Sequence, residues 1–189
     1  VKEAVEALIR GKASRFDLSL LTNASGSRYV GAVVSSGYDA RVNRATNDIR
    51  LRFGALSYGY IALRELASFD PLRYRLTIDG VQHEVSAMMV AIANTGIFGG
   101  GMRIAPDADP TDGLLDVTII HEASRTKLLR LLPSVYSGKF VTNPVVERLR
   151  AKVVEFDGDD LFVTGDGVEM GEVPARVEAV PGILNLIVG

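Results

Sequence analysis

The chain has 189 residues, 47% of them apolar, and a net charge of −2 from 21 basic and 23 acidic side chains. This length is typical of one domain, and the balanced charge gives no electrostatic footprint for nucleic acid. The absence of cysteine excludes disulfides and thiolate metal sites and is compatible with a reducing compartment. No apolar run has the length of a membrane span, and no signal peptide is recognisable, so we expect a cytoplasmic protein.

The N-terminal third predicts two helices and two strands. Apolar residues recur every three or four positions at the start of the chain and again before Pro71, which predicts helices over 2–10 and 50–67. Between them, residues 16–21 and 29–34 have the composition of strands, with a turn at Gly26-Ser27.

From residue 74 onward the apolar period changes to two, which is typical of strands. Alternating runs on both sides of Asp79-Gly80 predict a hairpin over 74–85. Ser124 is suited to cap a helix that carries Pro133 and ends at Gly138, and Asn143-Pro144 predicts a turn. Further strands are expected over 87–94, 114–120, 152–156, 161–164, 176–180 and 183–188. Many short strands and two or three helices predict an α+β domain, built on an antiparallel β-sandwich-like core.

A glycine-rich loop, Gly99-Gly100-Gly101, leads into a segment with four aspartates. Bare backbone of this kind can cradle a phosphate, although three glycines alone are more often a mobile turn. The P-loop pattern of a lysine followed by serine or threonine is absent, with Met102 next in the chain, and no helix follows as a dinucleotide fingerprint would require.

The four aspartates, at positions 107, 109, 112 and 116, do not form an EF-hand. Counted from Asp107, the position that requires glycine holds Asp112. A tight turn around Asp112 can still offer a carboxylate and carbonyl oxygens to magnesium, which keeps several waters. The alternative is a solvated acidic turn.

A second candidate is Thr164-Gly165-Asp166-Gly167-Val168-Glu169, in which Asp-Gly indicates a hairpin turn. His83 and His121 have no partner at metal-ligand spacing, so we interpret them as ordinary surface or core residues. Basic side chains at 125, 127, 130, 148, 150 and 152 are able to contact anionic lipid headgroups, or they simply form a solvated face.

The pattern N-x5-G-G-x2-I-A-P-x-A-x3-D-G-x-L-D over 94–116, together with the tail 174–182, resembles the C-terminal domain of the soluble diacylglycerol and lipid kinases, relatives of the sphingosine kinases. The resemblance covers nearly the whole chain and implies the same architecture. It also implies that Asp112 holds a structural magnesium ion with the main-chain oxygens of Asp109 and Leu114. Asp17 would belong to a water–magnesium network near the phosphoryl-transfer site, and residues 35–42 would be structural or line the lipid cleft.

The same resemblance makes residues 166–168 the counterpart of an Asp-Gly-Glu motif whose glutamate is the proposed general base. Asp166 and Gly167 match, but Val168 occupies the glutamate position and Glu169 comes one residue later. A shift of one position in a strand turns a side chain to the opposite face. Three interpretations follow: Asp166 supplies the base, which we prefer; a bulge re-aims Glu169; or the protein is a weak or inactive kinase.

We therefore expect residues 1–189 to be a C-terminal lipid-kinase domain that phosphorylates a hydroxyl of diacylglycerol or a similar lipid. The expected cofactors are Mg²⁺ and, as co-substrate, ATP, which the family binds mainly through an N-terminal domain whose Gly-Gly-Asp-Gly-Thr loop this chain lacks. Peripheral membrane contact is compatible with a lipid substrate, and the isolated chain is expected to have negligible kinase activity. The alternative is a non-catalytic lipid-binding or interaction module. The sequence specifies neither the lipid nor the oligomeric state.

Overall fold

The structure, a computed structural model, describes residues 5, 9–47 and 55–188. The predicted helix over 2–10 and the start of the helix over 50–67 therefore lie mostly or partly outside the described residues. Within the described ranges, no helix combines the length and the apolar character needed to cross a bilayer.

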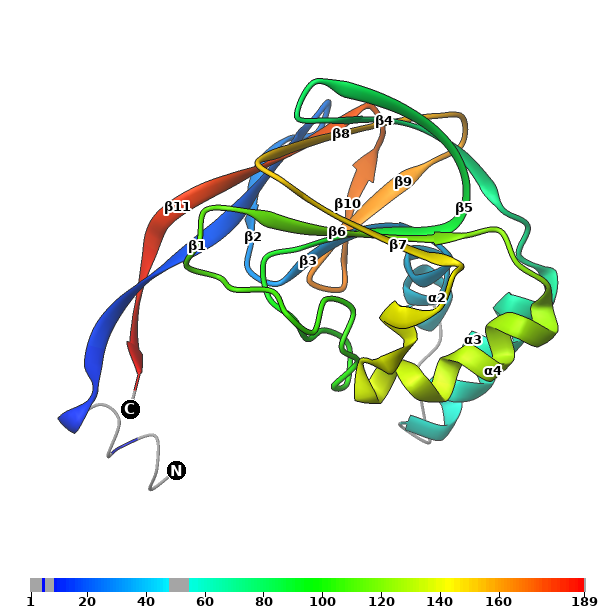
Figure 1. The fold of residues 1–189 in the computed structure, drawn as a ribbon, viewed down its shortest axis with the longest axis horizontal. Helices are drawn as coiled ribbons and strands as arrows, with labels where there is room; N and C mark the ends of the chain where they lie inside the picture. The colour runs from blue at the N-terminus through cyan, green and yellow to red at the C-terminus, as the bar shows by residue number, and fades with distance from the viewer. Residues whose placement is uncertain (1–4, 6–8, 48–54, 189) are drawn as a thin grey trace.

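Eleven described strands form one antiparallel sheet that curls on itself (Figure 1). Nine of them follow the order β10-β9-β3-β5-β4-β8-β11-β1-β2, while β6 pairs with β5 and β7. The strands are β1 (Lys12–Asn23), β2 (Gly26–Val30), β3 (Val33–Gly37), β4 (Leu72–Ile78), β5 (Val81–Ala93), β6 (Leu115–His121), β7 (Val146–Ala151), β8 (Val153–Asp157), β9 (Phe162–Gly165), β10 (Val168–Glu172) and β11 (Ala175–Val188). The predicted α+β class and sandwich-like core are confirmed.

Helices cover one side of this curled sheet, and β1 with β11 extends away from it as a two-stranded ribbon (Figure 1). The described helical elements are α2 (Tyr38–Asn47), α3 (Ala55–Ser68), α4 (Arg125–Ser137) and the 3-10 helix η1 (Lys139–Thr142). As predicted, Ser124 caps α4, Pro133 lies inside it, and Gly138 ends it with a positive φ of 75°.

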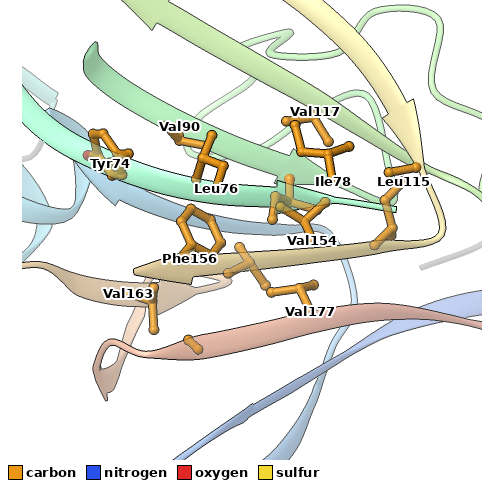
Figure 2. Packing of buried hydrophobic residues seen from close by; sticks show 14 of the residues in the cluster. Tyr74, Leu76, Ile78, Val90, Leu115, Val117, Val154, Phe156, Val163 and Val177 are labelled. Atoms are coloured by element: carbon orange, nitrogen blue, oxygen red, sulfur yellow. The ribbon is translucent and has the colours of Figure 1, made fainter. Parts of the chain in front are cut away.

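The main core fills the inside of the curled sheet. Tyr74, Leu76 and Ile78 of β4 pack against Val154 and Phe156 of β8, as Figure 2 shows. Each such side chain contributes about 1.5–3 kcal/mol when it is fully buried. A smaller cluster joins the helices to the sheet through Leu66, Phe69, Met88 and Leu128.

The runs predicted as separate strands over 81–85 and 87–94 form one strand, β5. Its first half alternates between exposed and half-buried residues, whereas residues 87–93 are buried on both faces. The alternating burial ends at residue 86 because helices and β6 cover the second half of the strand. The strand itself is not interrupted there.

The predicted strand over 29–34 is wrong, because the chain changes direction at Gly31-Ala32 and divides it into β2 and β3. The preceding turn lies at residues 24–25 instead of Gly26-Ser27, since Asn23 already pairs with Gly26. Four elements, α2, η1, β7 and β10, have no counterpart in the sequence prediction. The predicted turn after Asn143 is present at residues 144–145.

Candidate functional site

A cavity of about 310 Å³ brings together three segments that are far apart in the sequence. Ser35 and Asp39 enter it from the junction of β3 and α2, Phe98 and Gly99 from the glycine-rich loop, and Asp166 from the turn between β9 and β10. We call it the Asp39 cavity. The glycine-rich loop and the turn at residues 164–169 thus line the same cavity, together with residues of the segment 35–42.

Asp39 lies in the first turn of α2 and is held by a neighbouring hydroxyl. Ser35 Oγ donates a hydrogen bond to Asp39 Oδ2, and Ser35 Oγ lies 3.0 Å from Thr164 Oγ1. Asp39 Oδ1 is shielded from solvent and has no hydrogen-bond partner among the described residues. Burial raises the pKa of Asp39 to about 6, and the hydrogen bond from Ser35 opposes that shift only in part.

Asp166, the preferred base in the sequence analysis, lines the same cavity but uses its carboxylate for main-chain contacts. Oδ2 accepts from Gly31 N at 2.7 Å, and Oδ1 accepts from Ala32 N at 2.9 Å and from Val33 N at 3.0 Å. These contacts hold the bend between β2 and β3, which explains why the strand predicted over 29–34 is interrupted. The residue itself adopts a positive φ of 48° in the hairpin turn.

Glu169, the second candidate base, forms a bidentate ion pair with Arg44 of α2, and both N–O distances are 2.8 Å. The hydrogen bond from Arg44 lowers the pKa of Glu169. The pairing of β9 and β10 shifts between Glu169 and Gly171, so a bulge does occur here. Neither Glu169 nor Val168, which is 56% exposed, lines the Asp39 cavity.

Asp17 is only 2% exposed and connects two turns through its carboxylate. Oδ2 accepts from Gly113 N at 2.7 Å, and Oδ1 accepts from Gly182 N at 2.6 Å, at the point where the pairing of β1 and β11 shifts register. Asn94 Nδ2 donates to the carbonyl oxygens of Asp17 and Gly31. Hydrogen bonds therefore run from the acidic loop through Asp17 and Asn94 to the bend that Asp166 holds.

The acidic loop is organised by its own turns and by two arginines of β7. Asp112 Oδ1 accepts from Leu114 N at 2.9 Å, and Asp112 Oδ2 is paired with Arg150. Asp109 accepts hydrogen bonds from the hydroxyl and amide of Thr111, which lower the pKa of Asp109. The described residues contain no group of three His, Cys, Asp or Glu side chains placed to hold a metal ion.

In this arrangement the carboxylate of Asp112, the magnesium ligand implied by the resemblance, already has protein partners. Both oxygens of Asp112 already carry partners, and the carbonyl oxygen of Asp109 accepts from Asp112 N at 3.5 Å. A cation at Asp112 would compete with the guanidinium of Arg150. Magnesium at this loop stays a prediction, and no chemical step below depends on it.

The glycine-rich loop is a closed hairpin. Phe98 and Met102 exchange main-chain hydrogen bonds of 2.9 and 3.0 Å, and the three glycines between them have φ values of 40°, 75° and 94°. Positive φ at three successive positions explains why glycine is required there. Gly99 places this bare backbone at the edge of the Asp39 cavity.

Two of the six candidate lipid-contacting cations lie in the ion-pair network of the acidic loop. Arg148 pairs with Asp107 at 2.9 Å and Arg150 with Asp112, while Arg125 lies 3.6 Å from Asp70. His121 pairs with Glu147 at 2.8 Å on neighbouring strands. The acidic loop and β7 are thus joined by charge pairs.

Comparison with known proteins decides the family. Residues 32–188 match the model of the YegS C-terminal NAD kinase beta sandwich-like domain. The chain belongs to this family. The resemblance noted from residues 94–116 and 174–182 is therefore confirmed, and the match includes all the segments that line the Asp39 cavity.

Relatives of this YegS-type domain are named as lipid kinases. A diacylglycerol kinase of Mycobacterium tuberculosis (strain H37Rv) is 36% identical over 188 residues, which cover 98% of this chain and 61% of the relative. A protein of Xanthomonas axonopodis named "Probable lipid kinase YegS-like" is 27% identical over 190 residues, covering 97% and 60%. The chain thus spans about three-fifths of the length of these relatives.

Solved structures share the fold. A diacylglycerol kinase from Bacillus anthracis superposes with a TM-score of 0.67 at 13% identity, covering 99% of this chain and 58% of that structure. A second crystal structure from the same organism gives a TM-score of 0.75 at 19% identity, covering 99% and 60%. At these identities the likeness concerns the fold alone.

Proposed function

We propose that this YegS-type domain forms the lipid-binding part of a kinase that transfers the γ-phosphoryl group of ATP to a hydroxyl of diacylglycerol or a similar lipid. The observation that carries the proposal is the Asp39 cavity, in which carboxylates, hydroxyls and the bare backbone of Gly99 converge. The naming of a relative that is 36% identical over 98% of the chain supports the same reaction class.

Phosphoryl transfer needs a clamped triphosphate, cations that spread the developing charge, and a group that accepts the hydroxyl proton. This domain offers the last of these through the carboxylates of the Asp39 cavity. In the proposal, ATP is clamped by a segment outside these 189 residues, and any magnesium that Asp112, Asp109 and Leu114 bind has a structural role.

A small apolar cavity borders the start of α2, the helix that carries Asp39. Tyr38, which precedes Asp39 in the sequence, lines a second cavity of about 50 Å³ together with Met88, Leu128 and Leu132. In the proposal, the lipid hydroxyl faces Asp39 and the acyl chains lie along these apolar side chains of α4 and β5. This arrangement favours a lipid alcohol over a small polar substrate.

The test compares the full-length protein that contains this chain with the isolated chain 1–189. Both are incubated with vesicles containing diacylglycerol and with γ-labelled ATP, and labelled lipid is measured. We expect turnover by the full-length protein and none by the isolated chain above a no-protein control. Turnover by chain 1–189 alone would contradict the assignment of ATP binding to another segment, and inactivity of the full-length protein towards every lipid alcohol would contradict the function.

A non-catalytic lipid-binding module is the second candidate, and a specific observation favours it. The carboxylates expected to act as base are engaged: Asp166 accepts three main-chain hydrogen bonds, and Glu169 is paired with Arg44. Lipid binding by the full-length protein that is unaffected by ATP, without labelled product, would support this module.

A further inference from the structure

We infer that Asp39, rather than Asp166 or Glu169, is the residue that takes the proton from the lipid hydroxyl during phosphoryl transfer. This inference rests on the proposed lipid-kinase function and names a catalytic residue for it. The Asp-Gly-Glu pattern indicates the turn at residues 166–169. The segment 35–42 has no recognisable catalytic spacing, so no motif in the sequence singles out Asp39.

The position of Asp39 suits a proton acceptor. The hydrogen bond from Ser35 Oγ to Oδ2 fixes the orientation of the carboxylate, and Thr164 Oγ1, 3.0 Å from Ser35 Oγ, fixes the serine in turn. Oδ1 remains without a partner among the described residues and is shielded from bulk solvent. A buried polar atom without a partner is costly, so such atoms often mark functional sites.

The competing carboxylates are less available. Within the described part of the cavity lining, Asp166 is the other carboxylate, and it already accepts three main-chain hydrogen bonds. Glu169 lies outside the lining and would first have to leave Arg44. Asp39 Oδ1 has no hydrogen bond to lose among the described residues.

The electrostatic surroundings keep Asp39 ready to titrate near neutral pH. Burial raises its pKa to about 6, close to the working range of a general base. The groups that face or flank it are the uncharged phenol of Tyr74, the carboxylate of Asp166, and two arginines of α2 that are occupied with glutamates, Arg41 with Glu65 and Arg44 with Glu169.

In the proposed step the lipid hydroxyl oxygen attacks the γ-phosphorus of a nucleoside triphosphate. A bond forms between that oxygen and phosphorus, and the bond from phosphorus to the bridging β–γ oxygen breaks. The hydroxyl proton passes to Asp39 Oδ1, and nucleoside diphosphate leaves with the electron pair of the broken bond. No oxidant, reductant or further reactant is required.

The experiment measures kcat and KM for diacylglycerol between pH 5 and 8 with the full-length protein and its variants. Asp39→Asn is expected to lower kcat about 10²–10⁴-fold, the range of general base catalysis, with little change in KM. Ser35→Ala removes the hydrogen bond that lowers the pKa of Asp39, so the acidic limb of its pH profile should move to higher pH. Asp39→Glu should recover part of the activity lost in Asp39→Asn.

Asp70→Asn is the matched control, because Asp70 is 87% exposed and its nearest recorded cation lies 3.6 Å away. Its rate and pH profile should equal those of the wild type. An active wild type combined with an Asp39→Asn variant within threefold of it, or an unshifted Ser35→Ala profile, would overturn the role of Asp39 and leave the kinase function intact. A full-length wild type that phosphorylates no lipid would overturn both. If Asp39→Asn fails to fold, the Ser35→Ala profile decides.

Discussion

At the scale of single residues, the surroundings of each carboxylate decide its chemistry. Burial raises the pKa of Asp39 and of Asp116, whereas hydrogen bonds from neighbouring groups lower the pKa of Asp109 and Glu169. The sequence shows only that these residues are acidic. The direction of each pKa shift depends on the surroundings in the folded chain, such as the contact of Glu169 with Arg44, which is 125 positions away in the sequence.

The raised pKa of Asp39 predicts a pH-dependent loss of stability. An unfolded aspartate titrates near 4 and the folded one at about 6, so the native state binds the extra proton between these values. The stabilisation is complete below about pH 4 and is lost as the pH rises through 6, at a cost of roughly 3 kcal/mol. Melting of Asp39→Asn and wild-type protein from pH 4 to 8 should give curves that diverge between about pH 4 and 6, with the variant more stable at pH 7. Parallel curves would contradict the shift.

At the scale of elements, short polar contacts fix the junctions that the sequence pattern does not reveal. Asp166 ties the turn between β9 and β10 to the bend between β2 and β3. Arg44 stacks over Phe162 at 3.6 Å while it pairs with Glu169, so α2 is attached to both β9 and β10. The Asp39 cavity is therefore assembled from three separate parts of the chain.

We expect Asp166→Asn to destabilise the domain by about 2 kcal/mol, because an amide nitrogen would replace one acceptor that faces main-chain N–H groups. For a domain of this size the melting temperature should fall by about 4–8 °C in calorimetry.

Glu169→Gln should change stability by less than about 1 kcal/mol, because its ion pair is exposed to solvent. Asp159→Asn, at an exposed turn, is the control and should melt like the wild type. If Asp166→Asn melts at the same temperature as the Asp159→Asn control, the main-chain contacts of Asp166 do not stabilise the bend between β2 and β3.

At the scale of the whole molecule, the curled sheet brings the acidic loop and the Asp39 cavity into one hydrogen-bonded structure. Asp17 and Asn94 connect Gly113 on one side with Gly31 on the other. A change at the acidic loop can therefore affect the cavity without a direct contact.

The magnesium prediction concerns this loop. If Asp112 binds Mg²⁺, the ion should raise the melting temperature of the wild type and leave Asp112→Ala unchanged, since ligands that bind only the native state stabilise it. Asp107→Ala, which removes a carboxylate of the same loop paired with Arg148, should keep the response. An equal rise of the melting temperature with Mg²⁺ in wild type and Asp112→Ala would exclude a magnesium site at Asp112. The carboxylate of Asp112 would then keep its ion pair with Arg150 as a permanent contact.

Local signals in the sequence were sufficient for much of the fold. The Asp79-Gly80 hairpin, the Ser124 and Gly138 caps of α4 and most strands follow from turn chemistry and apolar period, because these depend on neighbouring residues. The glycine and aspartate pattern over 94–116 was enough to indicate the family.

By itself the sequence determined the α+β class, the family and the two motifs that border the cavity. Only the tertiary structure decided that the strand predicted over 29–34 bends, that residues 38–47 form a helix, and that Asp39 lines the same cavity as Asp166. The physical reason is that these features depend on contacts between residues far apart in the sequence. The bend depends on the carboxylate of Asp166, more than 130 positions away. The pKa of Asp39 depends on burial by segments that meet only in the folded sheet.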